Sequence, residues 1–385
     1  MSLICIDCRY INRRPSGIGE MVTALIAHVP QLAPDLRFRL LVSPLAPFPL
    51  SAASNVEQIV VEAAPNGPGT MWWLPRIADL RGVDLFHATY NIMPAGLSMP
   101  CITTIHDLMW LERPDWCDDG PLSPVRRAFF RHGIERALER SAFIATVSEA
   151  TRNSVVCYKP DAHARTQAIP SGVSNTFLRL PVRAQAIAST GLDPNRQFVL
   201  MIGQFAPYKN HAGALRAFAL VCADRNNVDL VIVHRQGRHA KKLLAMAMEL
   251  GISDRVHILP LLEQSYLLQL YAAASLLLHP SLCEGFGHPL AEAMACGCPV
   301  ITSDCSAMPE VTGDAAILIN PYDTAAIATA IKRVLDEPTL VLSMRQRGYA
   351  RAAQMEWMKS ALAYTALYRR VLCGSEYQSE TGCLS

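Results

Sequence analysis

The sequence has little net charge and no long hydrophobic run. It contains 35 lysines and arginines against 33 aspartates and glutamates, which gives a formal net charge of +2. That balance is too even to predict nucleic acid as a partner. No apolar run approaches the ~18 residues that a membrane span needs, and the first ten residues lack a basic leader, so we expect no signal peptide. These absences predict a cytoplasmic protein, either free or peripheral on the inner face of the cell membrane.

Cysteines are present but do not form a pattern typical of metal sites. There are 12, and in a chain without an export signal we expect them as reduced core residues. Cys5 and Cys8 have the spacing of half a zinc site, although residues three apart on a strand point to opposite faces. Cys296, Cys298 and Cys305 lack a second group with matching spacing. We therefore expect no structural zinc.

Short apolar runs are what the sequence has in quantity. Hydrophobic residues make up 51% of the chain and charged residues 18%, which argues against disorder. The runs are continuously apolar, as in parallel strands covered on both faces. We expect strands at 3–7, 39–43, 84–88, 101–106, 142–148, 198–203, 229–234, 255–260, 275–280, 299–303 and 315–320, and helices at 124–140, 211–224, 239–251, 265–274 and 324–336.

This alternation predicts an α/β protein with two doubly wound, Rossmann-like domains. Residues 178–197 interrupt the rhythm and are rich in turn-forming residues. We therefore expect an N-terminal, acceptor-side domain at 1–183 and a C-terminal, donor-binding domain at 184–373, whose last helix could pack back on the first domain. Residues 374–385 are expected to form a flexible tail. Ligands should bind beyond the carboxyl ends of the strands, in a cleft between the domains.

The segment "EGFGHPLAEAMACG" at 284–297 places a glycine-broken loop before a helix. Gly285 and Gly287 would let the backbone approach a ligand, and free N–H groups at a helix start favour an anion such as a diphosphate. Glu292 lies one turn into the helix and would repel phosphate, so the hydroxyl pair of a ribose suits it better. Taken alone, the segment is better explained by a surface glutamate on an amphipathic helix.

The wider segment 284–323 resembles the C-terminal signature of family-4 glycosyltransferases, in which seven residues separate two glutamates. Other stretches, which precede this segment, resemble further motifs of that family and occur in the family's order: "RPSGIGEM" (14–21), "TTIHDLMWLERP" (103–114), "ATVSEATRNSV" (145–155), "AIPSGVSNTF" (168–177) and "MIGQFAPYKN" (201–210). These motifs together span about 300 residues. The resemblance implies the GT-B fold, with two Rossmann-like domains facing a central cleft.

The same resemblance implies roles for individual residues. Glu284 would contact hydroxyls of the donor sugar, and Glu292 would hold the nucleotide ribose. Lys209 would neutralise the diphosphate, and His106 would hydrogen-bond the sugar near the reacting centre. Glu284, His106 and Lys209 are therefore the expected catalytic residues. The remaining residues expected to bind the donor are Gly17, Gly19, Gln204, Leu262, Gly285, Phe286, Gly287, His288, Pro289 and Leu290.

One departure from the family pattern and two candidate acceptor residues bear on this assignment. Many members of the family carry an arginine where this chain has Gln204, so the charge of the diphosphate would be met by Lys209, helix termini or another cation. His87 and Asn91 follow a predicted strand end and are candidates for the acceptor side, with local capping as the alternative.

The resemblance implies retaining transfer of a hexose from a nucleotide-diphosphate sugar to a saccharide or lipid-linked acceptor in bacterial surface polysaccharide synthesis. The stretches "IHDLMWLERP" and "PSGVSNTF" look most like mannosyl- and rhamnosyl-type members, which favours GDP-mannose over UDP-glucose or dTDP-rhamnose. No Asp-x-Asp motif is present to bridge a metal to the diphosphate, so we expect no metal and no resident cofactor.

Other functions remain open at this point. A sugar-nucleotide epimerase and a binding-only relative would share the architecture. A dinucleotide oxidoreductase is disfavoured because Val22 stands where a third glycine would fall. The arginine-rich helix 124–140, with Phe129 and Phe130, could contact anionic lipid; a solvated helix is the favoured alternative because Glu135 and Glu139 can pair with its arginines.

Overall fold

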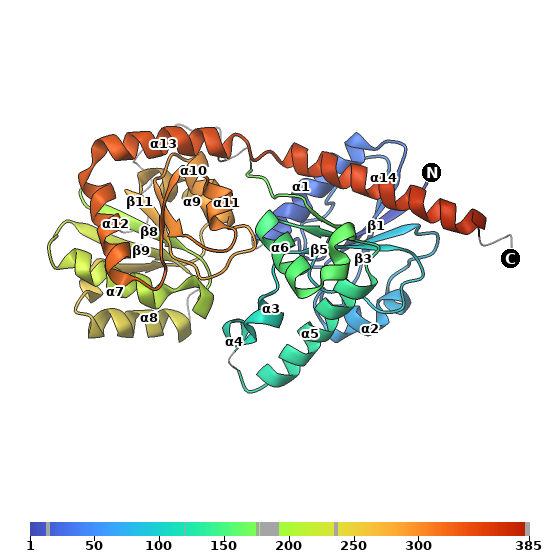
Figure 1. Ribbon diagram of the computed structural model, residues 1–385, viewed down its shortest axis with the longest axis horizontal. Coiled ribbons are helices and arrows are strands. Elements are labelled where there is room, and N and C mark those ends of the chain that lie inside the picture. Colours follow the sequence, from blue (N-terminus) through green and yellow to red (C-terminus); the bar gives the residue numbers. More distant parts are fainter. Residues whose placement is uncertain (13–15, 119, 175–176, 178–191, 235–237, 382–385) are drawn as a thin grey trace. The chain divides into compact units, whose positions relative to one another are not determined.

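The computed structural model describes residues 1–385 except 13–15, 119, 175–176, 178–191, 235–237 and 382–385 (Figure 1). The chain divides into two compact units, each built on one parallel β-sheet. The first unit comprises Met1–Gly172 and Glu356–Ser385, and the second comprises Val173–Met355. The division thus falls at Gly172, whereas the sequence analysis placed it at 183, inside a segment that lies outside the described residues.

The first unit contains a seven-stranded sheet with the order β3-β2-β1-β4-β5-β6-β7. All its strand pairs are parallel. The strands are β1 (Leu3–Asp7), β2 (Arg37–Val42), β3 (Val56–Val60), β4 (Leu85–Ala88), β5 (Cys101–Ile105), β6 (Phe143–Thr146) and β7 (Thr166–Ala168).

Helices cover both faces of this sheet (Figure 1). One hydrophobic core lies beneath α1 and α14, and the other beneath α2 and α5. The Ser16 hydroxyl starts α1 by accepting from Gly19 N, as an N-cap does. The helices are α1 (Gly17–Leu32), α2 (Pro68–Ile77), α3 (Met109–Glu112), α4 (Pro114–Cys117), α5 (Ser123–Arg140), α6 (Glu149–Tyr158), the 3₁₀ helix η1 (Pro160–Arg165) and α14 (Trp357–Thr381).

The second unit contains a six-stranded parallel sheet with the order β10-β9-β8-β11-β12-β13. Helices α7, α8 and α12 share one core on this sheet. The strands are β8 (Gln197–Ile202), β9 (Val228–Val233), β10 (Val256–Leu259), β11 (Leu276–His279), β12 (Val300–Ser303) and β13 (Ala316–Ile319). The helices are α7 (His211–Cys222), α8 (Arg238–Glu249), α9 (Gln264–Ala273), α10 (His288–Ala295), α11 (Met308–Thr312), α12 (Thr324–Asp336), α13 (Pro338–Ala352) and the 3₁₀ turns η4 (Pro207–Lys209) and η5 (Ser253–Arg255).

The predicted α/β fold is confirmed, and each expected strand is present within two residues of its predicted ends. The strands β3 and β7 were not predicted. Both lie at edges of the first sheet, where one side of a strand has no neighbour, so their sequences "VEQIV" and "TQA" need no continuous apolar run. The helix α14 packs on α1 within the first unit and runs to Thr381, across most of the segment predicted to be a loose tail.

Candidate active site

The residues of the second unit that were predicted to bind the donor gather at the carboxyl ends of its strands. Strand β8 leads to β9 on one side, whereas β11 leads to β12 on the other. The strand order therefore reverses between the neighbours β8 and β11, and ligands of such sheets bind at this switch point. Lys209 follows β8 and Glu284 follows β11, so the topology brings these two residues together.

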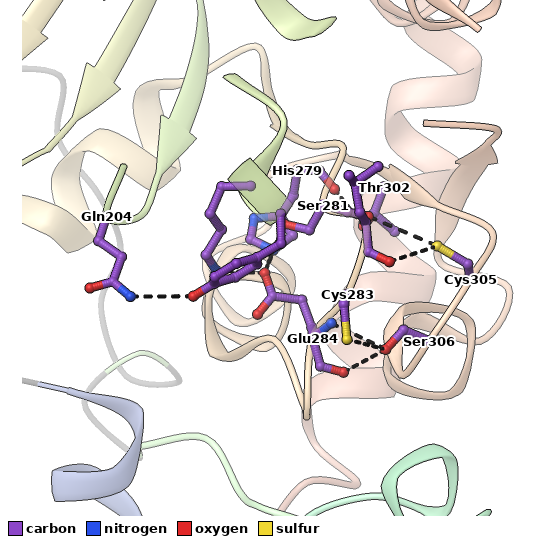
Figure 2. Close-up of polar contacts among 11 residues, drawn as sticks. Gln204, His279, Ser281, Cys283, Glu284, Thr302, Cys305 and Ser306 are labelled. Atoms are coloured by element: carbon purple, nitrogen blue, oxygen red, sulfur yellow. Dashed lines mark hydrogen bonds and ion pairs between the residues drawn. The ribbon is translucent and has the colours of Figure 1, made fainter. Parts of the chain in front are cut away.

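The Glu284 carboxylate is held by three donors on one of its two oxygens (Figure 2). Lys209 Nζ lies 2.5 Å from Glu284 Oε1. The His279 Nε2–H lies 2.8 Å from the same oxygen, and the Ser281 hydroxyl donates to it over 2.7 Å. Because a carboxylate only accepts, the contact requires the proton of His279 on Nε2. Glu284 Oε2 has no hydrogen-bond partner among the described residues, so it can accept from a ligand.

Burial and charge pairing act against each other at this cluster. Burial raises the pKa of Glu284, but the Lys209 ammonium and the hydrogen bond from His279 lower it by more, so its pKa falls well below the usual range. Burial likewise lowers the pKa of Lys209, while the charge of Glu284 more than offsets this and raises it. Burial lowers the pKa of His279 despite its bond to Glu284. The site therefore holds a carboxylate, an ammonium and a neutral imidazole at neutral pH.

The loop between Glu284 and α10 is shaped to expose backbone N–H groups. Gly287 has φ +91°, a conformation that favours glycine, and Pro289 occupies the first turn of α10, where no N–H partner is needed. The N–H groups of Phe286 and Gly287 donate to no other described residue. Glu284 itself is anchored by Ser306, whose hydroxyl lies 3.1 Å from Glu284 N and 2.8 Å from Glu284 O (Figure 2).

Glu292 lies inside the protein and not on the exposed face of a helix. It is 7% exposed, and its Oε2 accepts a 2.7 Å hydrogen bond from the hydroxyl of the fully buried Tyr271. This contact fixes the direction of the carboxylate within α10. The alternative of a solvated surface glutamate is therefore wrong.

The other residues of this unit that were expected to bind the nucleotide sugar lie around the switch point. Gln204 Nε2 donates to Tyr208 over 3.3 Å (Figure 2). Gly203 has φ +151°, a conformation that favours glycine, and a Cβ at that position would touch Lys209 Cε at 3.4 Å. Leu262 is half-buried in the loop between β10 and α9, and His288 and Leu290 belong to α10.

In the first unit the strand order reverses between β1 and β4. Gly17 is the first residue of α1, which follows β1. Gly19 is buried, and a Cβ there would lie 3.1 Å from Tyr10 O. Glu20, in the same turn, was not singled out from the sequence; burial raises its pKa to about 7.

His106 and Asn91 lie at the carboxyl ends of β5 and β4 and form one hydrogen-bonded unit. Asn91 Oδ1 accepts from His106 N over 2.7 Å, and its Nδ2 donates to Asp107 O over 3.0 Å. The His106 Nε2–H donates to Thr89 O over 2.9 Å, which leaves Nδ1 as an acceptor. Burial lowers the pKa of His106 to about 4. His106 is therefore neutral, and Asn91 supports the backbone that carries it.

His87 is placed differently from an acceptor-binding residue. It is completely buried on β4, with Nδ1 2.7 Å from the Tyr368 hydroxyl and Nε2 2.8 Å from Thr104 Oγ1. Both ring nitrogens are thus satisfied inside the protein, and the ring links the sheet to α14. Burial lowers the pKa of His87 to about 3. The structure favours the structural role for His87 over the acceptor role.

The sequence analysis also missed Tyr271, His279 and Ser281. His279 lies near the end of the expected strand 275–280 and Ser281 directly follows it, and polar residues after an apolar run are a usable signal. Tyr271 gives no such signal, because its partner Glu292 is 21 residues away.

Within the described ranges, no group of three His, Cys, Asp or Glu side chains is placed to hold a metal ion. No helix among those residues combines the length and apolarity of a membrane span.

The sequence is similar to a family of glycosyltransferases and to individual members with known roles. Residues 182–351 match the family model described as "Glycosyl transferases group 1". The chain is 29% identical over 278 residues to the O-antigen chain mannosyltransferase B of Escherichia coli, covering 71% of each protein. It is 30% identical over 282 residues to a D-inositol 3-phosphate glycosyltransferase of Nocardia farcinica; this alignment covers 71% of the chain but only 62% of that relative.

Solved structures share the fold. WaaG, a glycosyltransferase involved in lipopolysaccharide biosynthesis, matches with a TM-score of 0.74 at 19% identity, covering 95% of this chain and 99% of WaaG. The sucrose-phosphate synthase of Thermosynechococcus elongatus matches with a TM-score of 0.72 at 20% identity, covering 97% and 100%. At these identities the likeness concerns the fold. Residues 182–351 are therefore similar to group 1 glycosyl transferases, and the chain has the two-sheet, Rossmann-like fold of these solved structures, which is the GT-B fold.

Proposed function

We propose that this protein is a retaining family-4 glycosyltransferase that moves a hexose from a nucleotide-diphosphate sugar to a saccharide or lipid-linked acceptor in bacterial surface polysaccharide synthesis, working in the cytoplasm without a metal. Glu284 and Glu292 would be the paired glutamates of that family. The donor that we favour is GDP-mannose.

The arrangement of the Glu284 carboxylate carries the proposal. Three donors fix Oε1, so the carboxylate is oriented before any ligand arrives and Oε2 can accept a hydrogen bond from a sugar hydroxyl. Lys209, one of these three donors, supplies the positive charge that a departing diphosphate needs. The N–H groups of Phe286 and Gly287 add donors for phosphate oxygens at the start of α10.

In the proposed step, the bond between the anomeric carbon and the diphosphate oxygen breaks, and a bond from the acceptor hydroxyl oxygen to that carbon forms on the same face. The acceptor proton passes to an oxygen of the departing phosphate. Glu284 acts as a hydrogen-bond acceptor that orients the sugar. His106, neutral and with Nδ1 as acceptor, would receive a second sugar hydroxyl, while Glu292, steadied by Tyr271, would hold the ribose.

The choice of donor follows the similar proteins. Besides the mannosyltransferase above, the serotype-specific mannosyltransferase WbdA of Escherichia coli is 25% identical over 294 residues, covering 75% of this chain and 36% of WbdA. A solved structure with a TM-score of 0.70 and 17% identity holds UDP-glucose, which keeps UDP-glucose as an alternative beside dTDP-rhamnose.

A thermal-shift screen of the full chain with GDP-, UDP- and dTDP-sugars, followed by product analysis, tests the proposal. A donor at 100 times its dissociation constant should stabilise the protein by about 2.7 kcal/mol. We expect the largest shift with GDP-mannose and transfer to an added saccharide acceptor. Conversion of the donor sugar to its epimer without acceptor would instead identify an epimerase, and tight binding without turnover would identify a binding-only relative.

A further inference from the structure

Helix α7 begins two residues after Lys209, at the carboxyl ends of the strands, with backbone N–H groups that no described residue uses. Asn210 is its N-cap, and the Asn210 side chain accepts from Gly213 N over 3.2 Å, so that N–H is satisfied. The N–H groups of His211 and Ala212 donate to no described residue. Free N–H groups at a helix start attract anions, because the helix dipole places partial positive charge there.

The side chain of His211 also lacks a hydrogen-bond partner at this helix start. The residue is only 4% exposed, yet neither ring nitrogen forms a hydrogen bond with a described residue. Buried polar side chains are nearly always hydrogen-bonded, and a buried polar group left without a partner costs about 1–3 kcal/mol. Side chains of a helix lean toward its N-terminus, so the ring of this first helical residue lies beside the free N–H groups. A ligand at the helix start would satisfy both.

The groups around the His211 ring hold it in place and keep it neutral. The ring stacks on Phe205 at 5.8 Å between centroids and meets His234 edge-on at 6.1 Å. Burial, together with His234, Lys209 and His279 nearby, lowers the pKa of His211 to about 3. The imidazole is therefore uncharged at neutral pH, and one of its two nitrogens carries a hydrogen that it can donate.

We propose that the start of α7, defined as Lys209, His211 and the backbone N–H of Ala212, holds a phosphoryl group of the donor's diphosphate. This inference rests on the proposed function. Phosphoryl oxygens accept hydrogen bonds, and this place offers two backbone N–H groups, an imidazole N–H and an ammonium. The ammonium has three hydrogens, of which the contact with Glu284 Oε1 uses one. A diphosphate has two phosphoryl groups, and the start of α10 provides donors for the other.

Isothermal titration calorimetry of the full chain with GDP and with guanosine tests the inference; UDP and uridine replace them if the wild type binds UDP more tightly. His211→Phe keeps a ring that can stack on Phe205 and removes both nitrogens. We expect it to weaken GDP binding roughly 10- to 100-fold, because a hydrogen bond to a charged group is lost. Its affinity for guanosine, which has no phosphate, should equal that of the wild type. His211→Gln keeps an N–H donor and should weaken GDP binding less.

His257→Phe is the matched control, because it makes the same substitution in the same unit. His257 is the second residue of β10 and lies 3.4 Å from Asp229, near the amino ends of the strands. This variant should bind GDP as the wild type does, and circular dichroism and melting confirm that each variant is folded. Excess inorganic phosphate should compete with GDP for the wild type.

The inference is overturned if His211→Phe binds GDP normally, if it loses guanosine affinity to the same degree, or if His211→Gln loses as much affinity for GDP. Simultaneous binding of inorganic phosphate and GDP would also overturn it, because the helix start would then hold a different phosphate. A wild type that binds no nucleoside diphosphate would refute the proposed function and this inference with it. Normal GDP binding by His211→Phe would refute the inference alone.

Discussion

Lys209 Nζ contacts Glu284 Oε1 at 2.5 Å, although 75 residues separate the two in the chain. Both side chains are 11% exposed. The pair forms because β8 and β11 are neighbours and their carboxyl ends carry these two residues. Each charge makes the other tolerable in a poorly solvated place, and Glu284 Oε2 has no partner among the described residues.

Removing one member of this pair should harm both stability and transfer. Lys209→Ala leaves a buried carboxylate without its cation, which typically costs about 3–5 kcal/mol. The free energy of unfolding should drop accordingly, and transfer should be abolished. Denaturant unfolding measures the first effect, and product formation from labelled donor measures the second.

The double variant Lys209→Ala/Glu284→Ala is the control. It removes both charges and should recover much of the lost stability without recovering transfer. Equal instability of the double and single variants would mean that the charge pair does not determine the fold of this site. Wild-type-like transfer by Lys209→Ala would contradict the role of the lysine.

His279 should orient Glu284 through its Nε2–H. His279→Leu removes this donor, and we expect the efficiency of transfer to fall roughly 10- to 100-fold through misplacement of the carboxylate. His279→Gln keeps an N–H donor and should retain most activity. Dissociation constants for the nucleoside diphosphate alone should stay unchanged in both. Equal losses in the two variants would refute a hydrogen-bonding role.

Gly203 should be required for the position of Lys209. In Gly203→Ala a side chain at a backbone φ of +151° would strain the chain, and its Cβ would touch Lys209 Cε at 3.4 Å. We therefore expect a loss of stability of about 1–2 kcal/mol, and a loss of transfer because relief of the strain moves the lysine. Gly251→Ala is the matched control, because Gly251 also has positive φ, +69°, but nothing lies within 4 Å of its Cβ position. It should lose stability and keep its kcat. A similar loss of kcat in both variants would show that strain alone matters.

Glu20 predicts a pH dependence of stability. Its folded pKa is raised from 4.5 to about 7 by burial, so the folded chain binds this proton more tightly than the unfolded chain does. Stability should therefore fall as the pH rises from about 4.5 to about 7, with the loss complete above that range. Glu20→Gln cannot ionise and should be more stable than the wild type at pH 8, by about 1–3 kcal/mol, and similar at pH 4. Melting curves across this range measure the difference.

Glu149→Gln removes a glutamate from the first turn of α6 instead and is the control for this prediction. Its side chain is 58% exposed, so no stability gain should grow with pH. If Glu20→Gln behaves in the same way as Glu149→Gln at every pH, the burial of Glu20 has no energetic consequence.

Much of the fold follows from patterns along the chain. Continuous apolar runs such as 198–203 and 229–234 mark strands that are covered on both faces, and β8 and β9 are found there. The same reasoning failed for β3 and β7, because an edge strand is only partly covered and can be polar. The motif residues around Glu284 could be located from the sequence, since a loop and the helix after it are local features.

The contacts within the site could not be read in this way. Sequence alone gave His87 equal standing as an acceptor residue and as a structural one, whereas its bonds to Tyr368 and Thr104 join segments far apart in the chain. Glu292 fitted a surface position until Tyr271 was found to donate to it. Such partners depend on which strands are neighbours and which helix covers them.

The sequence by itself therefore determined the two parallel sheets, the glycine-broken loop after β11 and the identity of the residues at the strand ends. Only the tertiary structure decided that Lys209, His279 and Ser281 converge on one oxygen of Glu284, that His87 bonds to Tyr368 and Thr104, and that Trp72 packs against Phe129. The physical reason is that periodicity and turn-forming residues act over a few positions, whereas strand order and helix packing arise from burying the apolar surface of a whole unit at once.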